Sequence, residues 1–311
     1  MSADGLLAVV LSIAAATLFA VTTNLHRGAA SAVPVEDGGP LRLLLRLLRT
    51  PRWLLGSATA IVALGLHTVA LHYGTVILVQ AVLSTGLVLA LALEAVRERR
   101  RPGPKEFVAW VVVVVGVVAL LGLGHPGGGK VISVEALVLT LLLAVAVAAG
   151  GLLAGRTGLP RAAVAVVMGG AAGTLFALDA VFLKALATSG SLLGPRSLLD
   201  LGGFLLASVL GNLVVQRAYQ QAPLRHVLPA VTAADPLAAS IVGVALLHEH
   251  LRPGVLPVVG LVGGLAAMVV GIVAATQGVP GDELAHVAGA DADDVVVDAE
   301  ESDPSQQEAR T

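Results

Sequence analysis

Two aspartates lie inside long apolar stretches of the sequence, where an unpaired charge is costly. Asp235 stands near the centre of the stretch 223–248, and Asp179 lies within 162–187. A charged side chain in hydrocarbon is strongly destabilising, so it needs a partner, water or a function. We therefore expect Asp235, with Asp179 in support, to hold a cation or a coupling proton. A hard divalent cation would prefer such carboxylates together with carbonyl groups and water.

Each aspartate also has a purely structural interpretation. Asp235 precedes Pro236, and this pair is typical of an N-cap residue followed by the first residue of a helix. Asp235 would then cap a second half-helix after a kink, although a helix broken at mid-membrane is also how transporters expose backbone groups to substrate. For Asp179 the alternative is an ion pair with Lys184 or with a loop lysine near the outer leaflet.

Other polar side chains in apolar stretches are candidates for the same cavity. Asn212 and Gln216 are one helical turn apart, on one face of the stretch 201–220. The remaining candidates lie in the second and third apolar stretches and are His67, His72, Gln80, Ser84 and Thr85. For each of them the alternative is a hydrogen bond that only ties two helices together.

Other chemistries are excluded by composition and spacing. The run His248-Glu249-His250 suggests a metal site, but residues two apart point to different sides of a helix and no HExxH spacing is present. We expect this run to end a helix at the membrane edge. The chain has no cysteine, and it contains no P-loop, dinucleotide-binding loop or Ser/His/Asp set. We expect that the protein is not an enzyme, needs no cofactor and binds no nucleic acid.

The elements that must position these residues are membrane helices. Of the 311 residues, 56% are hydrophobic and 13% are charged, whereas soluble domains have about 25% charged residues. A helix needs about 20 apolar residues to cross the hydrocarbon layer. We predict an all-α, polytopic membrane protein in which Asp200 and Pro223 mark the starts of the seventh and eighth helices. The nine predicted spans are 5–26, 53–73, 75–96, 106–124, 136–155, 162–187, 201–220, 223–248 and 254–276.

Basic residues predict the orientation in a cell membrane. The loops on the N-terminal side carry four Lys or Arg residues, including Lys184, and those on the opposite side carry 14. The positive-inside rule then places the N-terminus outside and the C-terminus in the cytoplasm. Arg42, Arg46 and Arg49 fall on one face of a leucine-rich segment, which indicates a helix lying in the membrane interface or an amphipathic connector packed on the protein.

The chain divides into a transmembrane domain, 1–276, and a tail, 277–311. The tail holds ten of the 21 acidic residues and has no aromatic residue. A segment of this composition cannot bury enough apolar surface to fold alone. We predict that the tail is disordered and cytoplasmic.

Small residues spaced four apart predict close helix contacts. The spacing occurs in three of the apolar stretches, as Gly169 and Gly173, as Gly203, Ala207 and Gly211, and as Gly260 and Gly264. Small residues at such spacing let two helix backbones approach closely in a membrane.

An internal repeat relates the two halves of the chain. Ala8–Ala20 aligns without gaps on Ala165–Ala177, with nine of 13 positions identical. In a second echo, Glu98 and Glu249 each stand four residues before a Pro-Gly pair. Helices one to four and six to nine would thus be repeats, with the fifth as a linker. Because the first helices of the repeats are five crossings apart, the repeats are inverted, which is typical of secondary transporters.

The order of these elements resembles the drug/metabolite transporter superfamily. Ala70-Leu-His-Tyr73 closes one helix, the next ends in a glutamate, and a Pro-Gly turn and a Gly-rich helix follow; the run recurs from Ala218 to Gly254. The nine helices and Pro51-Arg-Trp-Leu-Leu-Gly56 resemble the NIPA-like magnesium transporter branch. The resemblance implies alternating access that moves a small solute or a cation such as Mg2+ across the bilayer. A lipid-binding subunit or scaffold that transports nothing is the alternative, and assembly as a homodimer is left open.

Overall fold

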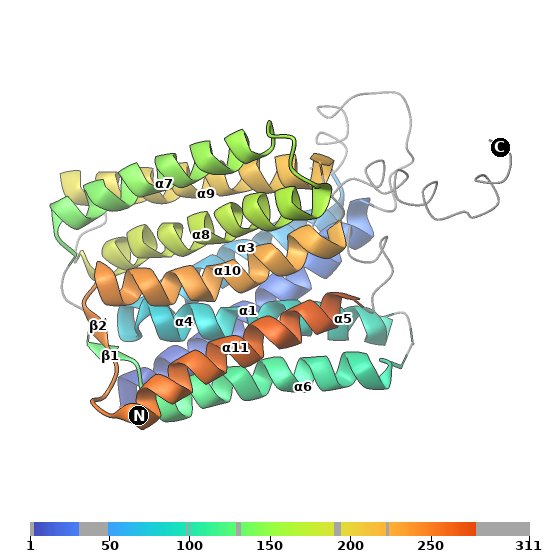
Figure 1. Cartoon of the computed structure of the whole chain (residues 1–311), viewed down its shortest axis with the longest axis horizontal. Coiled ribbons are helices and arrows are strands. Elements are labelled where there is room, and N and C mark those ends of the chain that lie inside the picture. The colour runs from blue at the N-terminus through green and yellow to red at the C-terminus, as the bar shows by residue number, and fades with distance from the viewer. Residues whose placement is uncertain are drawn as a thin grey trace, which may run out of the picture.

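The computed structural model describes residues 3–30, 49–97, 99, 101–128, 132–189, 194–221 and 224–277. Almost all of this part of the chain is helical (Figure 1). In chain order the helices are α1 (Ala3–Ala30), α3 (Pro51–Tyr73), α4 (Val76–Leu83), α5 (Thr85–Arg97), α6 (Pro104–Ala119), η1 (a π-helix, Leu120–Gly124), α7 (Val134–Ala154), α8 (Arg161–Thr188), α9 (Pro195–Gln221), α10 (Leu224–Ala245) and α11 (Val255–Gln277). Two short strands, β1 (Gly127–Gly128) and β2 (Glu249–His250), pair in an antiparallel manner.

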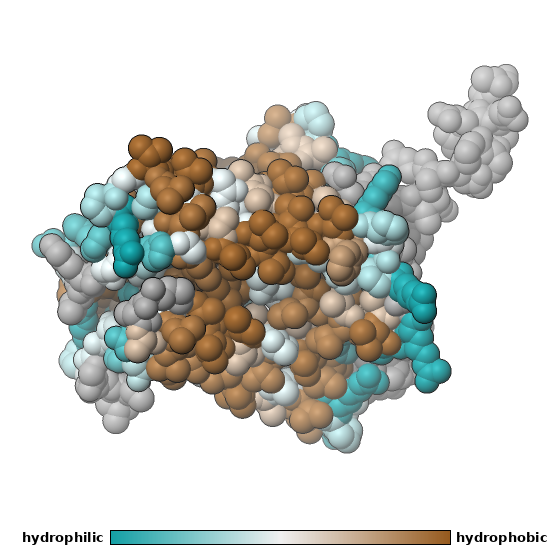
Figure 2. All heavy atoms as spheres, turned by 90° about the horizontal axis from the view of Figure 1, so that it is seen from below, coloured by the Kyte–Doolittle hydropathy of each residue, from teal (hydrophilic) through white to brown (hydrophobic). Residues whose placement is uncertain are grey.

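The prediction of nine membrane crossings is confirmed in the described part of the chain. It contains nine helical segments that are long and apolar enough to span a bilayer. Many large apolar side chains on their outer faces are exposed, and Ile61, Ile241 and Val255 are more than two-thirds exposed. Figure 2 shows these surfaces as a broad apolar zone across the middle of the molecule, with hydrophilic side chains toward its two ends. The chain is therefore a multi-pass membrane protein of the all-α class.

Three predicted elements differ from the observed ones. α9 begins at Pro195, so Asp200 does not cap it: this residue lies more than one turn inside the helix and is fully buried. α10 ends at Ala245, three residues before the predicted end, because the chain leaves the helix to form β2. The third crossing is divided at Ser84 into α4 and α5. Ser84 Oγ donates a hydrogen bond to the Gln80 carbonyl at this division.

The helices run between two faces of the molecule, which we call the N-terminal face and the opposite face. The N-terminal end of α1 and both strands lie on the N-terminal face (Figure 1). With nine crossings, α11 ends on the opposite face. α1 begins on the N-terminal face and α8 begins on the opposite face, as the inverted alignment of these two helices predicts.

The same packing pattern occurs in the two predicted repeats. α1 packs against α3 and against the third crossing, α4 and α5. In the same way, α8 packs against α9 and α10. The last helices of the two repeats, α6 and α11, pack against each other and join the halves. α7, predicted as a linker, packs on α8 and α9 and thus belongs to the second half.

Glycines at four-residue spacing make the close contacts that the sequence predicts. A Cβ atom added at Gly264 would lie 2.6 Å from the Gly116 carbonyl oxygen of α6. One added at Gly169 would lie 2.9 Å from the Val227 carbonyl oxygen of α10. Gly173 meets the α10 backbone around Val231 in the same way. These contacts place the α8 backbone directly on the α10 segment that carries Asp235.

Several predictions fall on residues that the structure does not describe. The leucine-rich segment lies outside the described residues except for Arg49, and so do Lys130, Pro223 and Glu98. The acidic tail lies outside them from residue 278 onward. These predictions remain as stated.

Candidate functional site

Asp235 lies at the middle of a membrane helix. It is 11 residues from the first residue of α10 and ten from the last, so about 15 Å of helix separates it from either end. α10 continues through both Pro229 and Pro236. Asp235 is therefore an interior helical residue, and the interpretation that it caps a second half-helix is wrong. The third crossing is divided near this site at Ser84, although the Ser84 amide still donates to the Gln80 carbonyl.

Asp235 receives a hydrogen bond from the other half of the chain. Gln80 Nε2, on α4, donates to Asp235 Oδ1 at 2.9 Å. His67, on α3, lies next to Gln80. His67 and Gln80 are both more than nine-tenths buried. Their Nε2 and Oε1 atoms have no hydrogen-bond partner of normal geometry in the described part of the chain.

Asp179 completes the arrangement from α8. Ser208 Oγ, on α9, donates to Asp179 Oδ2 at 2.8 Å. Asp179 also lies within electrostatic range of Asp235. Both aspartates remain half-buried, so part of each side chain is left uncovered by protein. We call His67, Gln80, Asp179, Ser208 and Asp235 the central polar cluster; its members come from five different helices.

The two aspartates have no cationic partner in the described part of the chain. The sequence left open an ion pair between Asp179 and Lys184, but Lys184 pairs with Glu249 instead: its Nζ lies 3.4 Å from Glu249 Oε1. Lys184 Nζ also donates to the Gly74 carbonyl at 2.6 Å. Neither aspartate forms an ion pair with any described Lys, Arg or His. Two carboxyl groups within electrostatic range of each other thus lie in the membrane interior with no described side chain to balance their charge.

Two predicted site residues are not among the residues bonded to the aspartates. Asn212 and Gln216 are exposed on α9, one and two helical turns beyond Ser208. Asn212 Nδ2 donates to the Ser208 carbonyl one turn earlier. The spacing placed both amides on one helix face correctly, but the packing of α9 turns that face outward. Neither amide bonds to Asp179 or Asp235 in the described part of the chain, and their place at the cavity stays a prediction.

Other candidates are also outside the cluster. His72 is exposed near the end of α3, where its ring contacts the Ala187 carbonyl. The side chains of Ser84 and Thr85 donate to the carbonyls of Gln80 and Val82 in the last turn of α4. The described residues contain no group of three or more His, Cys, Asp or Glu side chains arranged to hold a metal ion. A metal bound at Asp235 and Asp179 would therefore keep other ligands, such as water.

Two residues with buried polar contacts, Ser208 and Glu249, were not predicted as site residues from the sequence. Ser208 has no signal in the sequence, since a lone serine in a membrane helix is common. Glu249 did have a signal in the sequence, because it stands four residues before Pro253-Gly254, as Glu98 stands before Pro102-Gly103. The sequence also predicted that residues 248–250 end a helix; instead, Glu249 belongs to β2 and turns inward.

Comparison with known proteins gives one informative relative. The chain is 32% identical over 255 residues to an uncharacterized protein of Corynebacterium glutamicum, covering 80% of this chain and 87% of that protein. The two chains share a family. No family model matches the sequence, and no solved structure matches it. The 255 aligned residues are enough to include most of the nine crossings described in this chain.

Proposed function

We propose that this protein is a secondary transporter of the drug/metabolite type, which moves a small solute or cation across the membrane by alternating access. One observation carries the proposal. Asp235 and Asp179 lie within electrostatic range of each other in the membrane interior, and no described cationic side chain pairs with either. The family resemblance of the sequence agrees with this assignment.

The kind of ligand follows from the two aspartates, which have no cationic partner among the described side chains. A carboxylate at mid-membrane is unstable unless it is protonated or paired with a cation. Two carboxyl groups close together make the doubly ionised form still less favourable. A proton or a cationic ligand removes both penalties, so the cluster is suited to bind one and to release it when water gains access.

The position of the cluster supports alternating access. Gln80 and His67 belong to the first repeat, whereas Asp235, Asp179 and Ser208 belong to the second. The hydrogen bond between Gln80 and Asp235 therefore joins the halves at the depth where inverted-repeat transporters bind substrate. Movement of one half against the other would open the cluster to one face at a time.

The chemistry of the cluster favours a hard cation or a proton. Mg2+ keeps several water ligands and is commonly bound through one or two carboxylates. Asp179 and Asp235 supply two carboxylates, and the Gln80 Oε1 atom adds an uncharged acceptor that has no hydrogen-bond partner of normal geometry in the described part of the chain. A transporter of an organic solute would use the same carboxylates to exchange a coupling proton.

The orientation is part of the same proposal. The basic residues of the opposite face favour a cytoplasmic location for that face, so the N-terminal face would be external. Burial of Lys184 removes one of the four basic residues that the sequence placed on the N-terminal side, which increases the asymmetry. Single cysteines at Glu135 and Lys105, which are exposed on the two faces, test this in a chain without native cysteine. Labelling of position 105 but not of position 135 in intact cells would reverse the orientation.

The decisive experiment uses purified protein in liposomes that contain a trapped pH indicator. Mg2+ and a panel of small metabolites are added outside, and solute uptake and proton movement are recorded. We expect uptake by the wild-type protein and a loss of at least about tenfold in Asp235→Asn, which is equivalent to about 1.4 kcal/mol. Glu135→Gln, which neutralises an exposed acidic residue in the first turn of α7, is the matched control and should transport normally.

Two results would contradict the proposal. The first is a folded Asp235→Asn protein that transports as the wild type does. The second is a wild-type protein that moves none of the solutes and shows no thermal stabilisation by any of them, because a ligand that binds only the folded state raises its melting temperature. The second result would favour a scaffold or lipid-binding role.

A further inference from the structure

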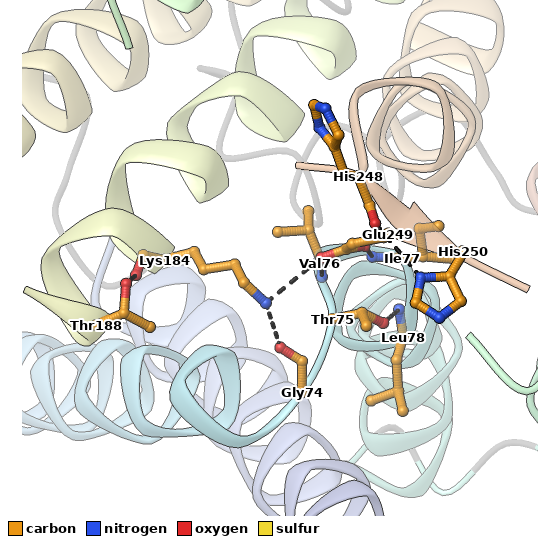
Figure 3. Close-up of polar contacts among 10 residues, drawn as sticks. All are labelled: Gly74, Thr75, Val76, Ile77, Leu78, Lys184, Thr188, His248, Glu249 and His250. Atoms are coloured by element: carbon orange, nitrogen blue, oxygen red, sulfur yellow. Dashed lines mark hydrogen bonds and ion pairs between the residues drawn. The ribbon is translucent and has the colours of Figure 1, made fainter. Parts of the chain in front are cut away.

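A second buried polar group lies on the N-terminal face, and it ties three segments together. The Glu249 carboxylate accepts hydrogen bonds from the backbone amides of Val76, at 2.7 Å, and Ile77, at 3.1 Å. Lys184 Nζ approaches the same carboxylate at 3.4 Å. Figure 3 shows Lys184 reaching from α8 and Glu249 from β2 toward the first turn of α4. We call Lys184, Glu249 and the amides of Val76 and Ile77 the N-terminal clamp.

The N-terminal clamp satisfies groups that would otherwise be costly to bury. The first amides of a helix have no partner within the helix, and its N-terminus attracts negative charge. Thr75 Oγ1 accepts a hydrogen bond from the Leu78 amide and meets part of this need. Glu249 supplies the rest from 173 residues away in sequence. Both charged side chains of the pair are less than one-tenth exposed.

The clamp connects the same segments that carry the central polar cluster. On α4, Val76 lies four residues before Gln80, and on α8, Lys184 lies five residues after Asp179. Glu249 is the fourth residue after the end of α10, the helix that carries Asp235. At 1.5 Å per residue, the clamp lies about 6 to 8 Å from the cluster along α4 and α8, on the side of the N-terminal face.

Close backbone packing leaves little room for Glu249 to shift. A Cβ atom added at Gly243 would lie 2.6 Å from Glu249 Oε2 and 2.8 Å from Ile77 Cγ1. The pairing of β2 with β1 places Glu249 opposite Gly128. His248, just before it, has a φ of 54°, a left-handed conformation that turns the chain inward for Glu249. The strand pair thus holds the Glu249 carboxylate in place, and the absence of a side chain at Gly243 leaves the space that the carboxylate occupies.

We propose that the N-terminal clamp is the closed gate of this protein on the N-terminal face, and that Glu249 must leave the α4 N-terminus before the central polar cluster can reach water on that side. This inference rests on the proposed transport function. In the structure described here the gate is shut, because Lys184, Glu249 and the α4 N-terminus are joined. Opening would release α4 from α8 and from the segment that follows α10.

The test measures access of a water-soluble thiol reagent to the cluster from one face, and it needs no substrate. Ser208→Cys introduces a near-isosteric reporter into a chain with no native cysteine. A membrane-impermeant methanethiosulfonate is applied from the N-terminal face of sealed vesicles. Glu135→Cys and Lys105→Cys identify that face and the opposite one without any assumption about orientation.

We expect slow labelling of the reporter in the wild-type background and at least about tenfold faster labelling in two gate variants. Glu249→Gln removes the ion pair with Lys184 and weakens the two hydrogen bonds from the α4 amides. Gly243→Ala leaves all charges in place but pushes the carboxylate from its site. The matched control is Glu106→Gln: this buried glutamate accepts a hydrogen bond from the Gly103 amide at the start of its own helix, α6, on the opposite face. It should leave the labelling rate unchanged.

The gate is overturned if both variants are folded, as judged by size-exclusion profile and helical content, and label from the N-terminal face at the wild-type rate. Faster labelling in the Glu106→Gln control as well would also overturn it, since that result would indicate general loosening. Failure of the transport function is a separate outcome. If labelling responds to Glu249→Gln but the protein in liposomes moves no solute, the gate proposal is supported and the transport proposal is contradicted.

Discussion

The Gln80 side chain donates a hydrogen bond to Asp235, with 2.9 Å between Nε2 and Oδ1, and this bond joins the two halves of the chain. An amide donor stabilises a carboxylate without cancelling its charge, so Asp235 still needs a proton or a cation. The bond also fixes the direction in which the carboxylate points. It therefore links the binding state of Asp235 to the position of α4.

The Gln80–Asp235 bond should appear as coupling between two substitutions. Gln80→Ala leaves the Asp235 carboxylate without its only described hydrogen-bond donor, and we expect transport to fall by about three- to tenfold. The double variant Gln80→Ala/Asp235→Asn should be no worse than Asp235→Asn alone, because residues in direct contact act non-additively. Transport rates of the four proteins in liposomes measure this. Losses that multiply would show that the residues act independently.

Removal of Lys184 should destabilise the fold. Lys184→Gln would leave the buried Glu249 carboxylate without its cation, and loss of one partner of a buried pair costs about 3 to 5 kcal/mol. We expect a clear decrease in melting temperature, with partial recovery when Glu249→Gln is added. Lys105→Gln is the control, because Lys105 is exposed at the start of α6 on the opposite face. A melting temperature equal in Lys184→Gln and in wild type would contradict the role of this ion pair.

The N-terminal clamp should loosen in acid. Burial raises the pKa of Glu249 above its usual value, although Lys184 and the amides of Val76 and Ile77 oppose the shift. A raised carboxyl pKa means that the folded protein binds this proton more tightly than the unfolded chain does. Protonation of Glu249 therefore begins at a higher pH than for an ordinary glutamate. As the pH falls through the raised pKa, the charge that holds Lys184 and the α4 amides is lost.

Labelling of the Ser208→Cys reporter from the N-terminal face should accordingly accelerate as the pH is lowered. Rates are divided by those of Glu135→Cys at the same pH, which removes the pH dependence of the thiol itself. Lys184 faces Glu249 from α8, His248 and His250 flank it on its own segment, and α4 presents only Val76 and Ile77. If Glu249 is responsible, Glu249→Gln removes the acceleration. An acceleration that persists in this variant would assign it to a histidine or to the cluster itself.

Neighbouring glycines of α11 should respond in opposite ways to alanine. A Cβ atom at Gly264 would lie 2.6 Å from the Gly116 carbonyl oxygen, so Gly264→Ala should separate α11 from α6 and cost about 1 to 3 kcal/mol. Gly263 has no atom within 4 Å of such a Cβ, and Gly263→Ala should be neutral or slightly stabilising. Thermal unfolding of the two purified variants measures the difference. Equal stability would show that α6 and α11 are not in close contact.

The sequence by itself determined the membrane helices and the most informative charged residues. Hydropathy is a local property, because 20 consecutive residues must match the bilayer whatever their neighbours are. Eight of the nine predicted spans consequently begin within a few residues of the observed helices. Asp235 and Asp179 could be singled out for the same reason, since the cost of a charge in hydrocarbon depends on depth. The early start of α9 was missed because the segment from Pro195 to Asp200 carries two charges and lowers the apparent hydropathy.

Only the tertiary structure decided which polar residues meet. Asn212 and Gln216 share a helix face, but the rotation of α9 is set by Gly203 and Gly211 packing on Phe182 and Phe176, and this turns the amides outward. Lys184 is five residues from Asp179 and 65 from Glu249, yet it pairs with Glu249 because β2 brings that residue to the α4 N-terminus. Such contacts depend on helix rotation and on long-range packing. Neither is contained in the periodicity or composition of any one segment.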